Sequence, residues 1–195
     1  DLVEIGECIA KVFFDERAGH FLGYDPLYDD VSGQVVYDEE GNPVYDESPV
    51  FTGDVVFERI LGFNLLTDPT ARSWEECQWV IYRKMVPIAD LKKHFAKDAS
   101  KMAWITASSE ETWKIFDSAT GTYRDGDGLI MVQEHYYRPC AGMEQGYYYI
   151  MVHGGILYEG ELPLGLFPIV YAGFDEAATS ARSFSLIKQL RPYQA

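Results

Sequence analysis

The stretch Gly53–Val80 constrains the fold most, because it combines two strand patterns with a fixed turn between them. Apolar residues alternate along Asp54–Arg59, which is typical of a half-buried strand. Asp68-Pro69 predicts a tight turn, and Ser73–Glu76 predicts a short helical turn. A second apolar run, Cys77–Val86, follows. The pattern predicts two strands joined at a rigid corner and gives no indication of a catalytic loop.

Composition places the chain among folded, β-rich proteins. Its 195 residues are 47% hydrophobic and 15% aromatic, and 14 of them are tyrosine, a residue that favours half-buried strand positions. A chain of this length can bury a substantial core. We therefore predict an α+β fold with a β-rich body of antiparallel meanders and hairpins and a few short helices.

The formal net charge of −15 limits the partners that the chain can bind. Such a chain repels phosphate backbones, so we do not expect it to bind duplexes through a basic face. No apolar run reaches the roughly 18 residues of a transmembrane helix, so no membrane partner is expected. The chain begins at Asp1 and shows no signal-peptide pattern, which we interpret as a trimmed or excised piece. Cys8, Cys77 and Cys140 are odd in number and widely spaced, which favours a reducing compartment over a disulfide framework.

Further strands and helices are expected along the chain, and we treat residues 1–195 as one domain. Strands are predicted at Cys8–Phe14, Leu129–Cys140, Tyr147–His153, Ile156–Tyr158 and Leu166–Tyr171. Helices are predicted at Pro87–Asp98, from Ser108 onward with Trp113 and Phe116 buried, and from Ser180 to Leu190. The last helix, beginning within residues 181–195, is expected to lead out of the domain as the start of a longer stem helix.

One segment of the chain is strongly acidic. From Ala18 to Glu58 there are ten Asp and Glu residues and no Lys or Arg. Within it, Val35–Tyr37 and Val44-Tyr45 flank Gly41-Asn42, a pair that is typical of hairpin turns. We expect residues 25–49 to form a protruding, solvated acidic hairpin or loop.

Few residue patterns point to catalysis or metal binding. Cys77 or Cys140 could pair with His135 or His153 as a nucleophile, but no orienting group or oxyanion loop accompanies them. Asp125–Gly128 lacks the third oxygen ligand of a calcium loop and is interpreted as a turn. Acidic pairs are explained by helix capping and by solvated turns. We predict no catalytic residue, no cofactor-binding residue, no cofactor and no metal ligand.

The aromatic run Tyr147–Tyr149 allows two interpretations. It could be a platform on which bases or sugars stack. Alternation along a strand would place Tyr148 on the face opposite to Tyr147 and Tyr149. Because Arg138 is the only basic residue nearby, a packed sheet face is favoured.

Several loose motifs follow one another along almost the whole chain. They comprise an aromatic-Asp strand end before a glycine, a Gly-Asp strand start, an Asp-Pro-x-Ala turn, tryptophans around an acidic pair, a Leu-Pro step and a small-x-Ser segment before a glutamine. Their principal residues are Asp15, Gly19, Gly53, Asp54, Asp68, Pro69, Ala71, Trp74, Trp79, Pro163, Ala181 and Gln194. This order resembles the wing region of the portal (head–tail connector) proteins of tailed bacteriophages. The chain departs from the family in its longer acidic hairpin, in Ala181 where glycine is usual, and in ending where the stem helix would begin.

The resemblance implies a structural subunit of a ring, typically of twelve copies, at one vertex of the capsid. Such a ring is the conduit for DNA packaging and ejection. Its partners would be copies of itself, capsid and scaffolding proteins, the terminase large subunit, tail adaptor proteins, and double-stranded DNA that passes without sequence-specific binding. The protein would lie in the virion, and in the host cytoplasm during assembly, and would not be an enzyme.

Two alternatives to the portal interpretation remain. The aromatic content and the acidic loops are compatible with a β-rich carbohydrate-binding or other surface binding module. The motif order is also compatible with another phage connector or tail component.

Overall fold

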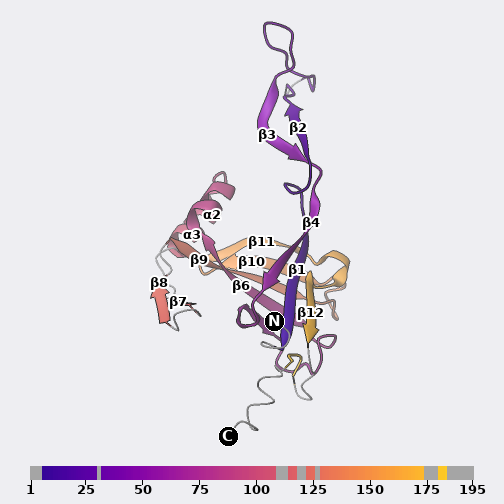
Figure 1. The fold of residues 1–195 in the computed structure, drawn as a ribbon, viewed down its shortest axis with the longest axis vertical. Coiled ribbons are helices and arrows are strands. Elements are labelled where there is room, and N and C mark those ends of the chain that lie inside the picture. The colour runs from indigo at the N-terminus through magenta and orange to yellow at the C-terminus, as the bar shows by residue number, and fades with distance from the viewer. Residues whose placement is uncertain are drawn as a thin grey trace. The chain divides into compact units, whose positions relative to one another are not determined.

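The strands and short helices of the chain are shown in Figure 1. The computed structural model describes residues 6–29, 32–108, 114–117, 122–125, 128–173 and 180–183. The strands are β1 (Glu7–Asp15), β2 (Phe21–Pro26), β3 (Tyr45–Phe51), β4 (Asp54–Ile60), β5 (Leu65–Thr67), β6 (Trp79–Pro87), β7 (Lys114–Asp117), β8 (Thr122–Asp125), β9 (Leu129–Tyr137), β10 (Tyr147–Val152), β11 (Gly155–Glu161) and β12 (Ile169–Gly173). The helices are α2 (Ile88–His94) and α3 (Ala99–Ser108), with single 3-10 turns η1 (Gly62–Asn64) and η2 (Pro163–Gly165). The predicted α+β class with a β-rich body is confirmed.

The largest sheet has five antiparallel strands in the order β11-β10-β9-β6-β5. Strands β6 and β9 pair over their whole lengths, from Trp79 opposite Tyr137 to Pro87 opposite Leu129. Strands β9, β10 and β11 form the predicted meander. The predicted Asp68-Pro69 turn lies in residues 68–78, which connect β5 to its antiparallel partner β6. The prediction that this turn joins the strand at Asp54–Arg59 to the next apolar run is wrong, because that strand is β4 and belongs to another sheet.

The chain divides into two compact units, one of Asp1–Ile9 with Ile60–Ala195 and one of Ala10–Arg59. A three-stranded sheet has the order β12-β1-β4, and the pairs β2-β3 and β7-β8 form two further ribbons. The predicted helix from Ser180, apart from residues 180–183, and Gln194 lie outside the described residues.

The core lies on one face of the five-stranded sheet, because alternate residues of β6 and β9 point to that face. Toward one end, Val80, Tyr82 and Tyr136 pack against Ile9 of β1 and Ile169 of β12. Toward the other end a second cluster joins the sheet to the helices. Its buried members are Ile105 of α3, Ile130 and Val132 of β9, Val152 of β10 and Leu157 of β11, with Leu91 and Phe95 packed against them.

The acidic segment contains a hairpin whose turn is closed by the side chain of Asp38. Strand β2 pairs with β3, and Tyr37 bridges Pro43. Between them, Asp38 Oδ1 accepts hydrogen bonds from the backbone N–H groups of Glu40 at 2.9 Å and Asn42 at 2.8 Å. These bonds hold the pKa of the exposed Asp38 carboxyl below its ordinary value, with the backbone bond from Asn42 as the largest cause. The turn lies where Gly41-Asn42 was predicted, and Gly41 has a φ of +85°.

The helix predicted to begin at Ser108 is wrong. Ser108 is the last residue of α3, and Phe116 lies on β7. The Ser108 side chain is buried, and its hydroxyl oxygen accepts a hydrogen bond from Gly154 N at 3.0 Å. The serine therefore joins the end of one helix to the β10–β11 turn and does not cap the next helix. The remainder of the predicted helix start, including Trp113, lies outside the described residues.

Candidate functional site

The corner between β5 and β6 is organised by one carboxylate. Asp68 is 7% exposed. Its Oδ1 accepts hydrogen bonds from Thr70 N at 2.9 Å and Thr70 Oγ1 at 2.6 Å, and its Oδ2 accepts one from Gln78 N at 3.4 Å. Ala71 N donates to Asp68 O at 3.3 Å, which closes a β-turn with Pro69 in its second position. These bonds, above all that from the Thr70 hydroxyl, hold the pKa of Asp68 below its ordinary value of 3.8.

An aromatic cluster packs beside this turn. The Trp74 ring stacks on Tyr171 with centroids 5.0 Å apart, and it meets the edge of Phe167 at 6.0 Å. Arg138 lies over Phe167, 4.6 Å from the ring centroid, and donates hydrogen bonds to the carbonyl oxygens of Trp74, at 3.3 Å, and Glu75. A cation held over a ring and bonded to backbone fixes the loop that carries Trp74.

A buried ion pair joins the first described strand to the last described segment. Arg182 Nε donates to Glu7 Oε2 at 2.7 Å, and Arg182 Nη2 donates to Glu7 Oε1. The same guanidinium donates to Leu65 O and to Gly62 O, each at 2.9 Å. Glu7 is 8% exposed, and its hydrogen bonds raise the pKa of Arg182. We call these groups, with Tyr171, the Arg182 clamp.

Tyr171 connects the clamp to the aromatic cluster. Its hydroxyl donates to Glu7 Oε2 at 3.4 Å and accepts a hydrogen bond from Ser183 N at 2.6 Å. Burial raises the pKa of this phenol. Tyr171 therefore contacts both Trp74 of the corner and Glu7 of the clamp.

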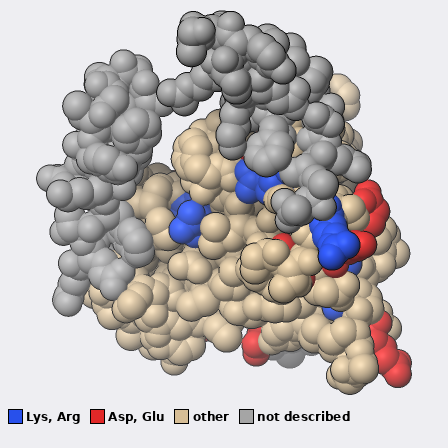
Figure 2. All heavy atoms as spheres, turned by 90° about the horizontal axis from the view of Figure 1, so that it is seen from below, with Lys and Arg blue, Asp and Glu red and all other residues tan. Residues whose placement is uncertain are grey.

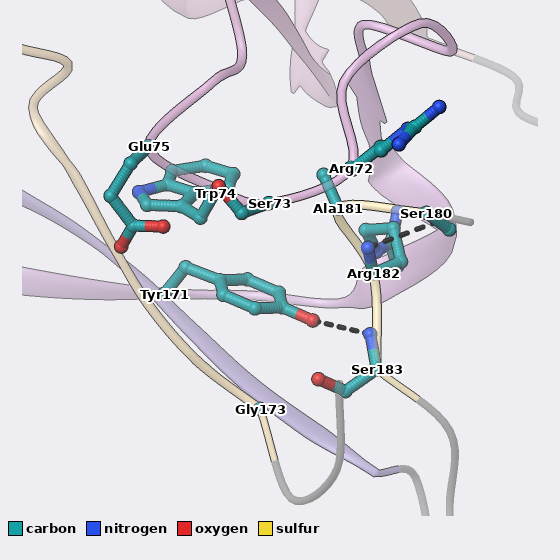
Figure 3. Close-up of a pocket in the computed structure, with 10 residues that line it drawn as sticks. All are labelled: Arg72, Ser73, Trp74, Glu75, Tyr171, Gly173, Ser180, Ala181, Arg182 and Ser183. Atoms are coloured by element: carbon teal, nitrogen blue, oxygen red, sulfur yellow. Dashed lines mark hydrogen bonds between the residues drawn. The ribbon is translucent and has the colours of Figure 1, made fainter. Parts of the chain in front are cut away.

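A small polar cavity of about 120 Å³ lies between these groups. Figure 3 shows Trp74 and Tyr171 facing one another on one side and the segment Ser180–Ser183 on the other. A cavity of this size holds a few waters and is smaller than the usual site of an organic ligand. Tyr171 and Arg182 of its lining belong to the clamp, and Trp74 stacks on Tyr171, so the arrangement supports a structural junction.

A second buried charge lies on the core face of the five-stranded sheet. Glu134 of β9 is 2% exposed, and its Oε1 lies 2.9 Å from Nζ of Lys84. The hydroxyl of Tyr136 donates to Glu134 Oε2 at 2.7 Å. A carboxylate at this depth is stable only while it is paired, so these contacts tie β6 to β9.

Most of the motif residues that the structure describes fall into two groups. Asp15, Gly19, Gly53 and Asp54 lie in the unit Ala10–Arg59, at strand ends and turns. The group at the corner comprises Asp68, Pro69, Ala71, Trp74 and Trp79, and Trp79 O accepts the backbone bond of Asp68 N at 3.3 Å. Pro163 opens η2.

In the unit Ala10–Arg59 the turn after β1 packs against the start of β4. Asp15 Oδ1 accepts a hydrogen bond from Arg17 N at 2.9 Å, and Asp54 Oδ1 accepts one from Val55 N at 2.7 Å. Gly19 has a φ of +86°, and a Cβ placed on it would lie 2.7 Å from the carbonyl oxygen of Gly53. The two glycines therefore allow the two segments to approach closely.

Replacing Gly19 with alanine should lower the free energy of unfolding by about 2–3 kcal/mol, because the left-handed backbone and the backbone clash both oppose a Cβ. Gly33→Ala is the matched control, since Gly33 has a φ of +65° but a Cβ there would meet nothing within 4 Å. Urea denaturation would measure both. Equal losses in the two variants would contradict the importance of the close approach.

Replacing Asp68 with alanine should lower the free energy of unfolding by about 1–3 kcal/mol, because three donors lose their acceptor. The pKa of Asp68 is depressed in the folded state. Its contribution is therefore fully present above the unfolded-state pKa and is lost as pH falls through the folded-state pKa. Urea denaturation from about pH 7 to pH 2 should show the difference between the parent chain and the variant shrinking in acid. A difference that stays constant with pH would contradict this role.

Cys77 and His135, two of the four residues considered for a Cys–His pair, have structural surroundings. Cys77 is fully buried in the core, and burial raises the pKa of its thiol. His135 stacks on Tyr149 with centroids 4.4 Å apart, and its Nε2 lies 3.2 Å from Gln133 Oε1. Within the part of the chain that the structure describes, no group of three or more His, Cys, Asp or Glu side chains could hold a metal ion.

The tyrosine run forms part of two stacked rows. Tyr148 stacks on Tyr136 and on Tyr158, whereas Tyr149 stacks on His135 and Tyr137. The predicted alternation of the run between the two faces is therefore confirmed. Burial raises the pKa of Tyr148 and Tyr149 to about 12, so both remain protonated at neutral pH.

The Arg182 clamp was not predicted from the sequence. Glu7 and Arg182 are 175 residues apart, and no local spacing links them. In the sequence, Ala181-Arg182-Ser183 shows only the small-x-Ser pattern. The available signal was Glu7, an acid beside a strand that was predicted to be buried, because a buried carboxylate requires a partner.

Comparison with protein-family models finds no match to this chain, and comparison with curated proteins finds none either. Among the described residues, no helix has the length and apolar character needed to cross a membrane.

Proposed function

We propose that this chain is the wing part of a phage portal subunit. In this function, copies of the protein form a ring at a capsid vertex through which DNA is packaged and ejected. The ring also receives the terminase and the tail adaptor proteins. The chain itself acts as a scaffold and performs no catalysis.

The observation that carries the proposal is the meeting of distant motifs at one junction. The Asp68-Pro69 turn and the Trp74 loop are close in the chain, whereas the segment Ala181–Ser183 lies more than 100 residues further on. They come together through the Trp74–Tyr171 stack and the Arg182 clamp. Motifs whose order resembles one family, and which share one structural junction, are better explained by a common scaffold than by chance spacing.

The charge and the contacts of ionisable groups support a scaffold. Each described group with a shifted pKa is explained by burial or by a structural bond, as for Asp68, Tyr171 and Arg182. A net charge of −15 disfavours tight binding of duplex DNA. Weak affinity suits a conduit, since strong phosphate contacts would hold the DNA in place.

Electron microscopy of the protein that carries this chain tests the proposal. We expect closed rings with a central channel. A duplex-binding assay at about 150 mM salt should show no sequence-specific retention. A protein that remains monomeric at all concentrations tested would overturn the proposal.

A further inference from the structure

The acidic segment, residues 18–58, carries both acidic residues and exposed apolar side chains; we call it the acidic arm. It carries ten of the 31 acidic residues of the chain and no Lys or Arg. It also exposes large apolar side chains, each of them at least 50% exposed: Phe21, Leu22, Tyr24, Tyr28, Tyr37 and Tyr45. Apolar groups gathered beside charges of one sign are typical of a protein-binding surface.

A second surface of the chain has the opposite charge. The helix pair from Ile88 to Ser108 carries four lysines, at positions 92, 93, 97 and 101, and two acids, at positions 90 and 98, which gives +2 in a chain whose net charge is −15. Lys93 and Lys97 are exposed. Figure 2 shows one face of the molecule, on which Lys and Arg side chains lie among uncharged residues and Asp and Glu side chains lie mainly toward the right and lower edges of the view.

An apolar groove adjoins these lysines. It has a volume of about 570 Å³ and is lined by Lys101 and Trp104 of α3 and by Ile156, Leu157, Tyr158 and Glu159 of β11. The Glu159 carboxylate accepts a hydrogen bond from the Tyr147 hydroxyl. Ile156 and Tyr158 are 40% and 54% exposed. A groove of this size with an aromatic wall can receive aromatic side chains, and the arm exposes several of them.

We propose that the acidic arm of one copy docks against the α2–α3 surface and its groove in a neighbouring copy. The two surfaces are complementary to each other, but neither is complementary to itself. A single contact of this kind is heterologous and joins copies head to tail, which closes into a ring when the rotation allows, whereas two reciprocal contacts between the same two copies would give a two-fold dimer. The inference rests on the proposed ring and names the surfaces that hold neighbouring subunits together.

The test uses paired charge reversals in this chain. The arm variant is Glu39→Lys with Glu40→Lys, and the helix variant is Lys93→Glu with Lys97→Glu. The matched control, Glu144→Lys with Glu161→Lys, reverses two exposed acids outside the arm. Sedimentation velocity at about 50 mM and 500 mM salt measures self-association, since exposed charge pairs are screened at high salt.

We expect the parent chain and the control to associate more strongly at low salt. The arm variant and the helix variant should each associate about tenfold more weakly than the parent chain, or not at all, because the attraction between the two surfaces becomes repulsion. An equimolar mixture of the arm variant and the helix variant should regain association, since the lysine-bearing arm then meets a glutamate-bearing helix. An arm that binds its own helices would not give this recovery.

The proposal is overturned if the parent chain stays monomeric at about 1 mM protein in low salt, if neither variant differs from the control, or if mixing restores nothing. The ring function is judged separately by microscopy. Rings that form unchanged in both variants would overturn the docking surfaces and leave the portal function standing. Salt-sensitive pairing with recovery on mixing, but without rings, would support the docking surfaces and contradict the portal function.

Discussion

Replacing Arg182 with alanine is expected to lower the free energy of unfolding by about 3–5 kcal/mol, the usual result of removing one partner of a buried ion pair. The change leaves the Glu7 carboxylate buried and removes the donor to the carbonyl oxygens of Gly62 and Leu65. Because the Arg182 side chain is 27% exposed, water can enter and bring the loss to the lower end of this range. Urea denaturation followed by tryptophan fluorescence would measure it.

Arg72→Ala is the matched control for this experiment. Arg72 lines the same cavity, but it is exposed. Its replacement should change stability by no more than about 0.5 kcal/mol. Arg182→Lys should recover only part of the loss, because an ammonium cannot reproduce the forked contacts of a guanidinium. If Arg182→Ala behaved like Arg72→Ala, the clamp would have no stabilising role.

Replacing Lys84 with methionine should lower the free energy of unfolding by about 2–4 kcal/mol, because Glu134 loses its cationic partner inside the core. Lys84 is itself 30% exposed, which moderates the expected loss. The double variant Lys84→Met with Glu134→Gln should be more stable than the single one, since no buried charge then lacks a cation. Lys93→Met, at an exposed position of α2, is the control. Additive effects of the two core substitutions would contradict the pairing.

Local patterns predicted most of the strands correctly, because strand alternation and turn residues act over a few positions. The alternation along Asp54–Arg59 predicted β4, and the Asp68-Pro69 turn was also predicted, although the strand before it is the short β5, which was not predicted. The apolar spacing after Pro87 predicted α2, although the helix ends at His94 and not at Asp98. The helix does not continue to Asp98 because Asp98 N donates its hydrogen bond to Phe95 O, in a turn that precedes α3.

Long-range contacts account for what the sequence did not predict. Ser108 has the local signature of a helix start, yet Gly154 N binds its hydroxyl oxygen and the residue ends α3. Glu7 and Arg182 form a site only after β1 and residues 180–183 have been brought together. Neither event leaves a short-range pattern, since each depends on residues distant in the chain.

The separation of Glu7 and Arg182 also has a kinetic consequence. A contact across 175 residues closes a loop of nearly the whole chain, and the entropy lost in that closure must be recovered from contacts formed earlier. The hairpins β5–β6 and β9–β10–β11 close much shorter loops. We therefore expect the clamp to form after the folding transition state. Weakening it would then shorten the lifetime of the folded chain while leaving its folding rate nearly unchanged.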